Sequence, residues 1–307
     1  MTFIKNIAIV GGSGQMGTPL VKALVESKRF NLTAITRSES DSTFPPTVNV
    51  LRGDYDSEDF LQSSFSNQEV LIIILATTAP KDLQPRLIRA ATAVAVSYIL
   101  PTEFGPDTAN SALAQAVPFL FPKKSLRDQI KASQSSSLIA VVNGLWFDFS
   151  LAGGFFGINI KERTARLYDD GQTLFSTTTL AQVARGVTKL FELPSSELEK
   201  FKNHFVYVSS FAVSQTQILR SVQKATGTSN EDWKISSVPV DEAIEMGLAE
   251  FQNGNFKGLL DVLYGNNSKP GMGGNFEHKL NNELLGLESE DLDIVVNKIV
   301  DCIENKM

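Results

Sequence analysis

Short apolar segments alternate with amphipathic ones over the first half of the chain. Six apolar runs are rich in β-formers and bounded by turn residues: FIKNIAIV, LTAIT, VNVL, VLIIILA, SYIL and LIAVVN. Helical patterns lie between several of them, over residues 15–27, 57–65, 81–95 and 122–134. Near-continuous apolar strands separated by helices are typical of a parallel sheet covered on both faces. The pattern predicts an α/β fold with a Rossmann-type, doubly wound parallel sheet.

The pattern is interrupted once in this half and changes after about residue 150. Residues 37–47, RSESDSTFPPT, hold two prolines and predict a loop where a helix could have stood. Further on, TARLYDDGQTLFSTTT resembles a hairpin around Asp170-Gly171. A helix over 179–192, the strand HFVYVSS and a helix over 214–226 predict α/β units that return to the sheet. Residues 229–288 predict short helices and a flexible loop, GNNSKPGMGGN.

A last amphipathic helix is expected over residues 289–304. Its buried stripe is predicted to hold five apolar side chains: Leu292, Val295, Val296, Ile299 and Ile303. Cys302 lies beside that stripe, so we expect a packed thiol without a reactive role. These elements predict two parts. Residues 1–150, with segments from about 177 to 228 returning to it, form the main domain, and residues 151–307 form mainly a smaller α/β lobe with the C-terminal helix.

Charge and cysteine usage narrow the possible partners and compartment. The formal net charge is −6 with a pI near 5.1 and no basic block, so nucleic acid and anionic membranes are not expected partners. The single cysteine cannot form an internal disulfide, which fits a reducing compartment. The N-terminus runs directly into a strand pattern, and VLIIILA is too short to span a bilayer. We therefore expect a cytoplasmic protein. His204 and His278 are widely spaced and predict no metal site.

The segment IAIVGGSGQMGTPLVKAL carries the strongest ligand signal. Gly11, Gly14 and Gly17 directly follow the first strand and open a helix. In that context the first glycine permits a tight turn, the second lets the backbone approach a pyrophosphate, and the third allows close helix–strand packing. The helix N-terminus supplies N–H donors to the anion. The sequence therefore predicts a dinucleotide site, the alternative being a glycine-rich turn without a ligand.

The end of the second strand bears on which dinucleotide binds. An acidic residue there selects NAD, whereas this sequence reads ITRSES, with Arg37 between Thr36 and Ser38. A guanidinium suits a 2′-phosphate in shape and charge, so we expect NADP(H). In the alternative, Arg37 is a solvated loop residue, and Glu39 or Asp41 selects the cofactor.

The stretch FLFPKKSLRDQ, residues 119–129, falls where ordinary short-chain dehydrogenases place a tyrosine four residues before a lysine. Here Phe119 stands four residues before Lys123. At 100° per residue, Leu126 and Ile130 share the buried helix face, with Lys123 about 40° and Lys124 about 140° from its middle. Lys123 is therefore predicted to point inward as a general acid/base of lowered pKa. In the alternative, its ammonium only bonds a ribose or a carbonyl.

Two strand ends supply further candidates. YILPTEFGPD places Thr102 to Gly105 at the carboxyl end of the fifth strand, where open α/β folds bind ligands. VVNGLWFDF brings Asn143 and Gly144 to the same edge. A pocket for a flat apolar substrate is predicted from Glu103, Trp146 and Phe147, with Phe149, Phe155 and Phe156 nearby. For each aromatic residue core packing is the alternative, and for Glu103 an exposed turn.

Together these residues resemble the isoflavone reductase-like, or NmrA-like, family of atypical short-chain dehydrogenases, particularly its fungal branch. The likeness rests on the glycine turn, Arg37, TEFG and the Lys123–Arg127 spacing, and extends to DDGQTLFSTTTLAQVARGV. The family usually reads SEFG, and here Thr102 replaces the serine. Plant reductases follow the lysine with a small residue, whereas here Lys124 follows Lys123. The resemblance implies a set of cofactor contacts: Gly11, Ser13, Gly14, Gln15, Met16, Gly17 and Arg37, with Thr77, Phe104, Lys123 and Asn143 on the nicotinamide side.

The resemblance also implies an activity. Reductases of this family pass a hydride from NADPH to an aromatic or phenylpropanoid-type substrate, with a lysine matching Lys123 as general base and no catalytic tyrosine. We therefore expect an NADPH-dependent reductase of a small aromatic or conjugated, secondary-metabolite-like molecule. Two alternatives stay open. One is a non-enzymatic NADP(H) sensor with a protein partner, for which an inward lysine has no use, and the other is a redox-neutral isomerase or cyclase that retains NADP(H).

Overall fold

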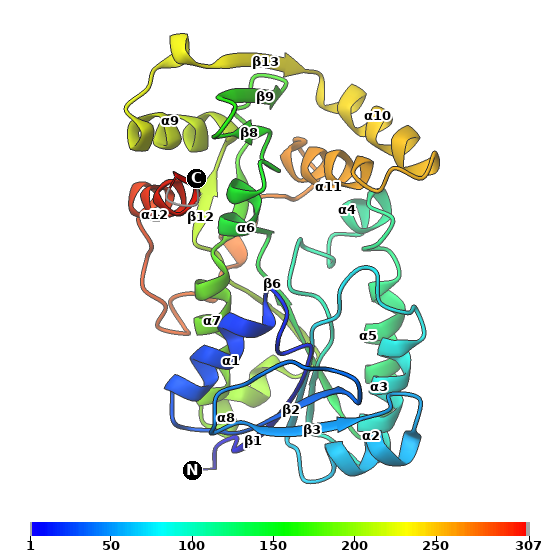
Figure 1. Ribbon diagram of the computed structural model, residues 1–307. Helices are drawn as coiled ribbons and strands as arrows, with labels where there is room; N and C mark the ends of the chain where they lie inside the picture. The colour runs from blue at the N-terminus through cyan, green and yellow to red at the C-terminus, as the bar shows by residue number, and fades with distance from the viewer. Residues whose placement is uncertain (1, 305–307) are drawn as a thin grey trace.

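The computed structural model describes residues 2–304, and a seven-stranded sheet organises the first part of the chain (Figure 1). All neighbouring strands are parallel, in the order β11-β6-β5-β4-β1-β2-β3. The order reverses direction beside β1, so β1 and β4 flank the crevice at the carboxyl edge. The strands are β1 Asn6–Val10, β2 Asn31–Arg37, β3 Asn49–Gly53, β4 Val70–Ile73, β5 Tyr98–Leu100, β6 Ser137–Val142 and β11 His204–Tyr207. The predicted Rossmann-type sheet is confirmed.

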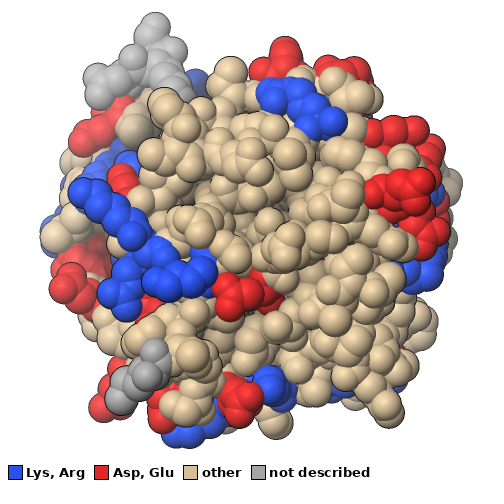
Figure 2. Space-filling view, turned by 90° about the horizontal axis from the view of Figure 1, so that it is seen from below, with Lys and Arg blue, Asp and Glu red and all other residues tan. Residues whose placement is uncertain are grey.

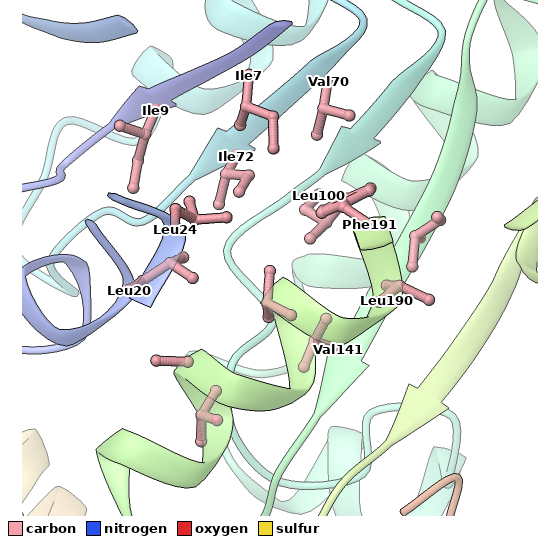
Figure 3. Close-up of a cluster of buried hydrophobic side chains, with 14 of the residues drawn as sticks. Ile7, Ile9, Leu20, Leu24, Val70, Ile72, Leu100, Val141, Leu190 and Phe191 are labelled. Carbon is pink, nitrogen blue, oxygen red and sulfur yellow. The ribbon is translucent and has the colours of Figure 1, made fainter. Parts of the chain in front are cut away.

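Alternate side chains of the strands enter two different cores, one on each face of the sheet. Ile7 and Ile9 face the helices α1 (Gly17–Glu26) and α7 (Leu180–Glu192), as Figure 3 shows. Ala8 and Val10 face the helices α2 (Glu58–Phe65), α3 (Leu83–Ala93) and α5 (Lys123–Ala132). Burial on both faces explains why these strands read as continuous apolar runs.

The second part lies above the sheet in Figure 1 and has its own apolar core. It contains two three-stranded sheets, ordered β12-β10-β7 and β13-β9-β8. Its strands are β7 Leu145–Trp146, β8 Ile158–Asn159, β9 Thr164–Tyr168, β10 Phe175–Thr178, β12 Phe211–Val213 and β13 Lys234–Val238. Its main helices are α6 Phe147–Ala152, α9 Gln215–Thr226, α10 Val240–Gln252, α11 Gly258–Ser268 and α12 Leu292–Glu304. Between the parts lies α4, Ser111–Ala116, which the sequence analysis did not predict.

Several expectations for this second part were wrong. The turn at Gly171 forms, but β9 pairs with β8 and β13 while β10 pairs with β7 and β12, so there is no hairpin. The helix over 214–226 packs on α12 rather than on the sheet. The segment GNNS is the buried last turn of α11 rather than a loop, because Asn266 and Asn267 donate their side-chain N–H groups to main-chain carbonyls one turn earlier.

The C-terminal helix α12 buries Val296 and Ile299 as predicted, together with Val300. Cys302 is exposed, which corrects the expected packed thiol, because the buried stripe turns away from it.

The loop predicted after Arg37 is confirmed over residues 38–48. In the view from below the sheet, acidic and basic side chains are interspersed around a broad uncharged area (Figure 2). No helix within residues 2–304 has the length and apolar character needed to cross a membrane.

Candidate active site

The glycine turn joins β1 to α1 at the carboxyl edge of the sheet. Gly11 has φ +85°, and a Cβ there would lie 1.8 Å from the Ile74 carbonyl oxygen. A Cβ on Gly17 would lie 2.1 Å from the Gly11 oxygen, so both positions require glycine. A Cβ on Gly14 would meet only that oxygen, at 3.4 Å, which leaves the outer side of the turn open. The turn is thus built for close approach of a ligand to its backbone.

The N-terminus of α1 is available to that ligand. Among the described residues, no side chain caps this helix, and its first turn holds no acidic residue. The first N–H groups of a helix lack partners inside it and attract anions. Ser13 and Gln15 are exposed beside the turn, whereas the Met16 side chain is fully buried in the core. Met16 can therefore contact a ligand only through its main chain.

Arg37 ends β2 with its side chain 68% exposed, and its Nε lies 3.4 Å from Glu39 Oε1. The loop that follows is tied back toward the glycine turn. Arg52 donates to the carbonyl oxygens of Ser40 and Ser42, at 3.1 and 2.7 Å, and the Ser42 hydroxyl donates to Ser13 Oγ at 3.0 Å. Arg37 therefore directly precedes a loop that is anchored at the glycine turn.

Asp41, the other acidic candidate for selecting the cofactor, is exposed on the same loop. The exposed Thr77 follows β4, and the hydroxyl of Thr102 joins the neighbouring strand ends. It donates to the Ile73 carbonyl at 3.0 Å and accepts from the Leu75 N–H at 3.2 Å. Threonine thus performs this hydrogen bonding in the TEFG segment.

Three successive carbonyl groups after β5 organise the far side of the crevice. The Glu103 oxygen accepts from Lys123 Nζ, and the Phe104 oxygen accepts from Trp146 Nε1, both at 2.8 Å. The Gly105 oxygen accepts from the N–H groups of Asn143 and the glycine after it, at 3.0 Å each. Because these bonds join β5, α5 and the β6–β7 connection, Lys123 and Trp146 meet at adjacent peptide groups.

The backbone at Phe104 is strained. Its φ is +28°, in a region that bulky residues rarely adopt, and the side chain is buried. Such a conformation persists only where the surroundings hold it, and it is concentrated at functional sites. Here hydrogen bonds on the carbonyls at 103, 104 and 105 hold the segment. The strain marks this corner as a candidate site.

The two adjacent lysines of α5 differ as the helical phase predicts. Lys123 points inward, and its desolvation lowers the pKa of the ammonium; the nearby Glu103 carboxylate opposes this effect and Arg127 adds to it. Lys124 is 74% exposed and pairs with Asp128 one turn later. Among residues 2–304, then, α5 presents one lysine of perturbed pKa to the crevice.

Glu103 is neither the expected pocket acid nor an exposed turn residue. Its side chain is 2% exposed and forms an ion pair with Arg127, Nη1 to Oε1 at 2.6 Å. Its other oxygen accepts the Thr108 hydroxyl at 2.7 Å. Both carboxylate oxygens are occupied inside the protein, so Glu103 faces the crevice only through its main-chain oxygen. Arg127 and Thr108 were not predicted as site residues; an arginine on the inward helix face was the available signal.

Asn143 directly follows the neighbouring strand β6 and is fully buried. Its side-chain N–H donates to the Gly144 oxygen at 3.2 Å, while its Oδ1 accepts no hydrogen bond from the described residues. A buried amide oxygen without a donor is costly and calls for an external one. Asn143 is therefore suited to receive an N–H or O–H group of a bound molecule.

Aromatic side chains continue from this corner into the second part. Trp146 is half-buried and meets the partly exposed Phe149 edge to face at 5.8 Å, and Phe149 lies 5.3 Å from Phe155 between ring centroids. Phe147 is fully buried and packs on Phe156 and Phe211. The prediction of Phe147 as a pocket residue is corrected, because the first turn of α6 directs it into the core and leaves Phe149 at the surface.

A surface cavity of about 280 Å³ lies at the opposite, amino edge of the strands, lined in part by Phe3, Lys5 and Arg29. It shares no residue with the crevice. Within the described chain, no group of three or more His, Cys, Asp or Glu side chains could hold a metal ion. The glycine turn and Lys123 both lie at the carboxyl edge of the sheet, away from this cavity.

Residues 4–152, which carry the glycine turn and Lys123, match the sequence model described as "NmrA-like family". Over these residues the chain is similar to proteins of the NmrA-like family. This confirms the resemblance on which the cofactor contacts were predicted. The match covers β1 to α6 and therefore ends within the first elements of the second part.

Other proteins match nearly the whole chain. Oxidoreductase aprR of Aspergillus flavus is 28% identical over 96% of this chain and 98% of its own length. AtPrR2, solved with NADP⁺ and (+)-pinoresinol, superimposes with a TM-score of 0.75 at 18% identity, covering 97% of this chain and 100% of its own. The leucoanthocyanidin reductase–NADPH complex from Vitis vinifera gives 0.76 at 14% identity, covering 96% and 99%. The chain thus shares its full fold with these two solved structures.

Proposed function

We propose that this NmrA-like protein is an NADPH-dependent oxidoreductase of the isoflavone reductase-like type, and that it reduces a small aromatic or conjugated molecule. The observation that carries the proposal is Lys123, an inward ammonium of lowered pKa held on the Glu103 carbonyl at the carboxyl edge of the sheet. A protein that only senses the dinucleotide has no need of such a lysine. The fungal relative named as an oxidoreductase supports the proposal.

The residues present fit NADP(H). A side chain at Gly11 or Gly17 would fill the turn, the first N–H groups of α1 suit a pyrophosphate, and Arg37 is free enough to meet a 2′-phosphate. Ser13, Gln15 and the main chain of Met16 line the turn. Thr77, Phe104 and Asn143 would contact the nicotinamide side of the cofactor. The unpaired Asn143 oxygen would accept a cofactor N–H or O–H. When bound, NADPH supplies the hydride. Two structural neighbours, solved with NADP⁺ and NADPH, support this cofactor.

Lys123 has the task of managing the proton. Addition of a hydride to the carbon of a C=O, C=C or C=N bond leaves an electron pair on the neighbouring atom, which must then take up a proton. Lys123 Nζ holds that proton, and its lowered pKa makes the transfer easier than from an ordinary lysine. Water can return the proton afterwards, so a tyrosine at position 119 is not required.

The substrate class is inferred from the aromatic side chains beside this lysine. Trp146, Phe149 and Phe155 offer partly exposed rings at the entrance of the second part. Ring faces and edges favour flat, conjugated molecules. We propose that this part, mainly residues 151–307, forms the substrate lobe. Pinoresinol, bound to a neighbour, and the substrate named for the Vitis vinifera reductase are consistent with an aromatic partner.

Calorimetry with NADPH and NADH tests the proposal, followed in the same preparation by NADPH consumption with aromatic enones, imines and benzylic ethers. The expected result is tighter binding of NADPH and turnover of at least one compound class. Binding without turnover, together with product formed without NADPH loss, would indicate the redox-neutral enzyme. Binding with no product at all would favour the sensor, and a failure to bind either dinucleotide would overturn the proposal.

A further inference from the structure

Two side chains of α5, one turn apart, contact the same residue of the β5–α4 connection. Lys123 Nζ donates to the main-chain oxygen of Glu103 at 2.8 Å, and Arg127 Nη1 donates to its carboxylate at 2.6 Å. Residues four apart lie on one face of a helix, so both bonds hold Glu103 against the same surface of α5. The position of the Lys123 ammonium therefore depends on where Arg127 holds Glu103.

The ion pair is closed to solvent. The side chains are 9% and 2% exposed, and Thr108 completes the arrangement. Its hydroxyl donates to Glu103 Oε2 at 2.7 Å and accepts from Arg127 Nη1 at 3.0 Å, while its carbonyl accepts from Nη2 at 3.3 Å. The Arg127 guanidinium also lies 5.2 Å over the Phe205 ring of β11. With these contacts made, the pair has no free carboxylate oxygen to bind a ligand, and its action is on its neighbours.

Lys123 is the neighbour on which the pair acts. The charges that influence its ammonium are the Glu103 carboxylate, which favours the protonated form, and the Arg127 guanidinium, which disfavours it. Nearby charges on adjoining elements are neutralised elsewhere: Asp107 by Lys279 at 2.7 Å, and Lys124 by Asp128. A buried ion pair contributes little net stability compared with apolar residues of the same size, so its presence needs another explanation.

We propose that Glu103 and Arg127 are positioning residues for Lys123, holding the carbonyl that orients its ammonium and acting on that ammonium with opposing charges. The proposal deepens the proposed function, since it assumes that Lys123 is the proton donor there. It predicts that the two single-charge removals change Lys123 in opposite directions. A merely structural ion pair predicts two variants that differ from the wild type only in stability.

The first experiment needs no substrate. Competitive labelling of lysines with acetic anhydride between about pH 7 and 11, read by mass spectrometry, gives the pKa of Lys123, and the adjacent Lys124 serves as the internal control. Glu103→Gln leaves Arg127 uncompensated and is expected to lower the pKa of Lys123 by roughly one unit. Arg127→Met leaves the carboxylate uncompensated and is expected to raise it by a similar amount. Arg127→Lys restores the cation and should return the pKa toward the wild-type value.

The double variant Glu103→Gln/Arg127→Met keeps the test decisive if a single variant does not fold. It removes both charges together, so it is expected to fold and to show a pKa of Lys123 between those of the singles. Shifts of the same sign in the two single variants, or no shift in either of them, would overturn the proposal. If one single variant does not fold, the other is compared with the double variant, and equal pKa values of Lys123 in that pair would overturn the proposal. The control variant Lys124→Met/Asp128→Asn removes the exposed ion pair of the same helix and should leave Lys123 unchanged.

Turnover then separates this inference from the proposed function. If both hold, the limb of the pH–rate profile that reports Lys123 moves with the labelling result in each variant. Opposite labelling shifts in a protein that turns over no substrate would support the positioning role and count against the reductase. Turnover with unshifted labelling and unshifted pH profiles would leave the reductase in place and overturn the positioning role.

Discussion

At the scale of single residues, Arg37 and Lys123 carry the two halves of the proposed chemistry. Arg37→Ala is expected to weaken NADPH binding by roughly 1.5–3 kcal/mol, the loss of a hydrogen bond to a charged group. NADH lacks the 2′-phosphate, so its affinity should hardly change. Calorimetric titration with both cofactors measures the difference. Equal losses for the two cofactors would exclude a phosphate contact and return the selection to Glu39 or Asp41.

Lys123→Ala is expected to abolish turnover while cofactor binding is mostly retained, because the glycine turn and Arg37 are untouched. Lys124→Ala serves as the matched control, since its side chain is 74% exposed and only pairs with Asp128. Steady-state kinetics with the compound that proves active, together with NADPH titration, checks both variants. A Lys123 variant of full activity would mean that the ammonium does no more than bond the Glu103 carbonyl.

Aromatic residues two positions apart on α6 provide a contrast between core and site. Phe147→Ala removes a fully buried ring and should cost about 3–5 kcal/mol of unfolding free energy. Phe149→Ala removes a ring that is 36% exposed, so it should cost less than about 1.5 kcal/mol but raise KM for an aromatic substrate. Urea unfolding and kinetics of the two variants separate these effects. A Phe149 variant with unchanged KM would place the substrate elsewhere.

At the scale of elements, helix α7 depends on one residue at its start. Thr179 Oγ1 accepts from the Gln182 N–H at 3.0 Å and donates to Glu290 Oε2 at 2.8 Å. Ser57 caps α2 through one bond only, from the Phe60 N–H at 3.2 Å. We expect Ser57→Ala to cost about 1 kcal/mol and Thr179→Ala about 2, because the latter also loses the contact with Glu290. Equal midpoints in urea would show that the second bond contributes nothing.

The elements of the first part were predictable because both faces of the sheet are buried. Strands such as β1 and β4 therefore appear in the sequence as continuous apolar runs. The glycine turn and the phase of α5 followed from steric and helical geometry alone. The partners of Glu103 could not be predicted from the sequence, since the ion pair with Arg127 joins residues 24 positions apart through a tertiary contact. The assumed hairpin at Gly171 failed for the same reason: a local turn does not determine which strands pair across it.

At the scale of the whole molecule, the inward lysine links activity to stability. The unfolded chain binds the Lys123 proton more tightly than the folded one, since burial lowers the pKa in the fold. Between the lowered pKa and about 10.4, stability therefore rises with pH through this group. Lys123→Met should raise the unfolding free energy at pH 7, and its advantage should shrink as the pH approaches 10.4. An advantage that grows with pH would contradict an ammonium disfavoured by burial.

The order of the central sheet also has a consequence for how the chain is made. The edge strand β11 and the helix α7 cover β6 and β1, yet they follow in the sequence after several elements of the second part. At about 5–20 residues per second, a ribosome needs several seconds to progress from β6 to β11. During that interval the nascent first half exposes the apolar face that Leu190 and Phe191 later cover. The growing chain therefore has an obligatory period in which chaperones can bind it.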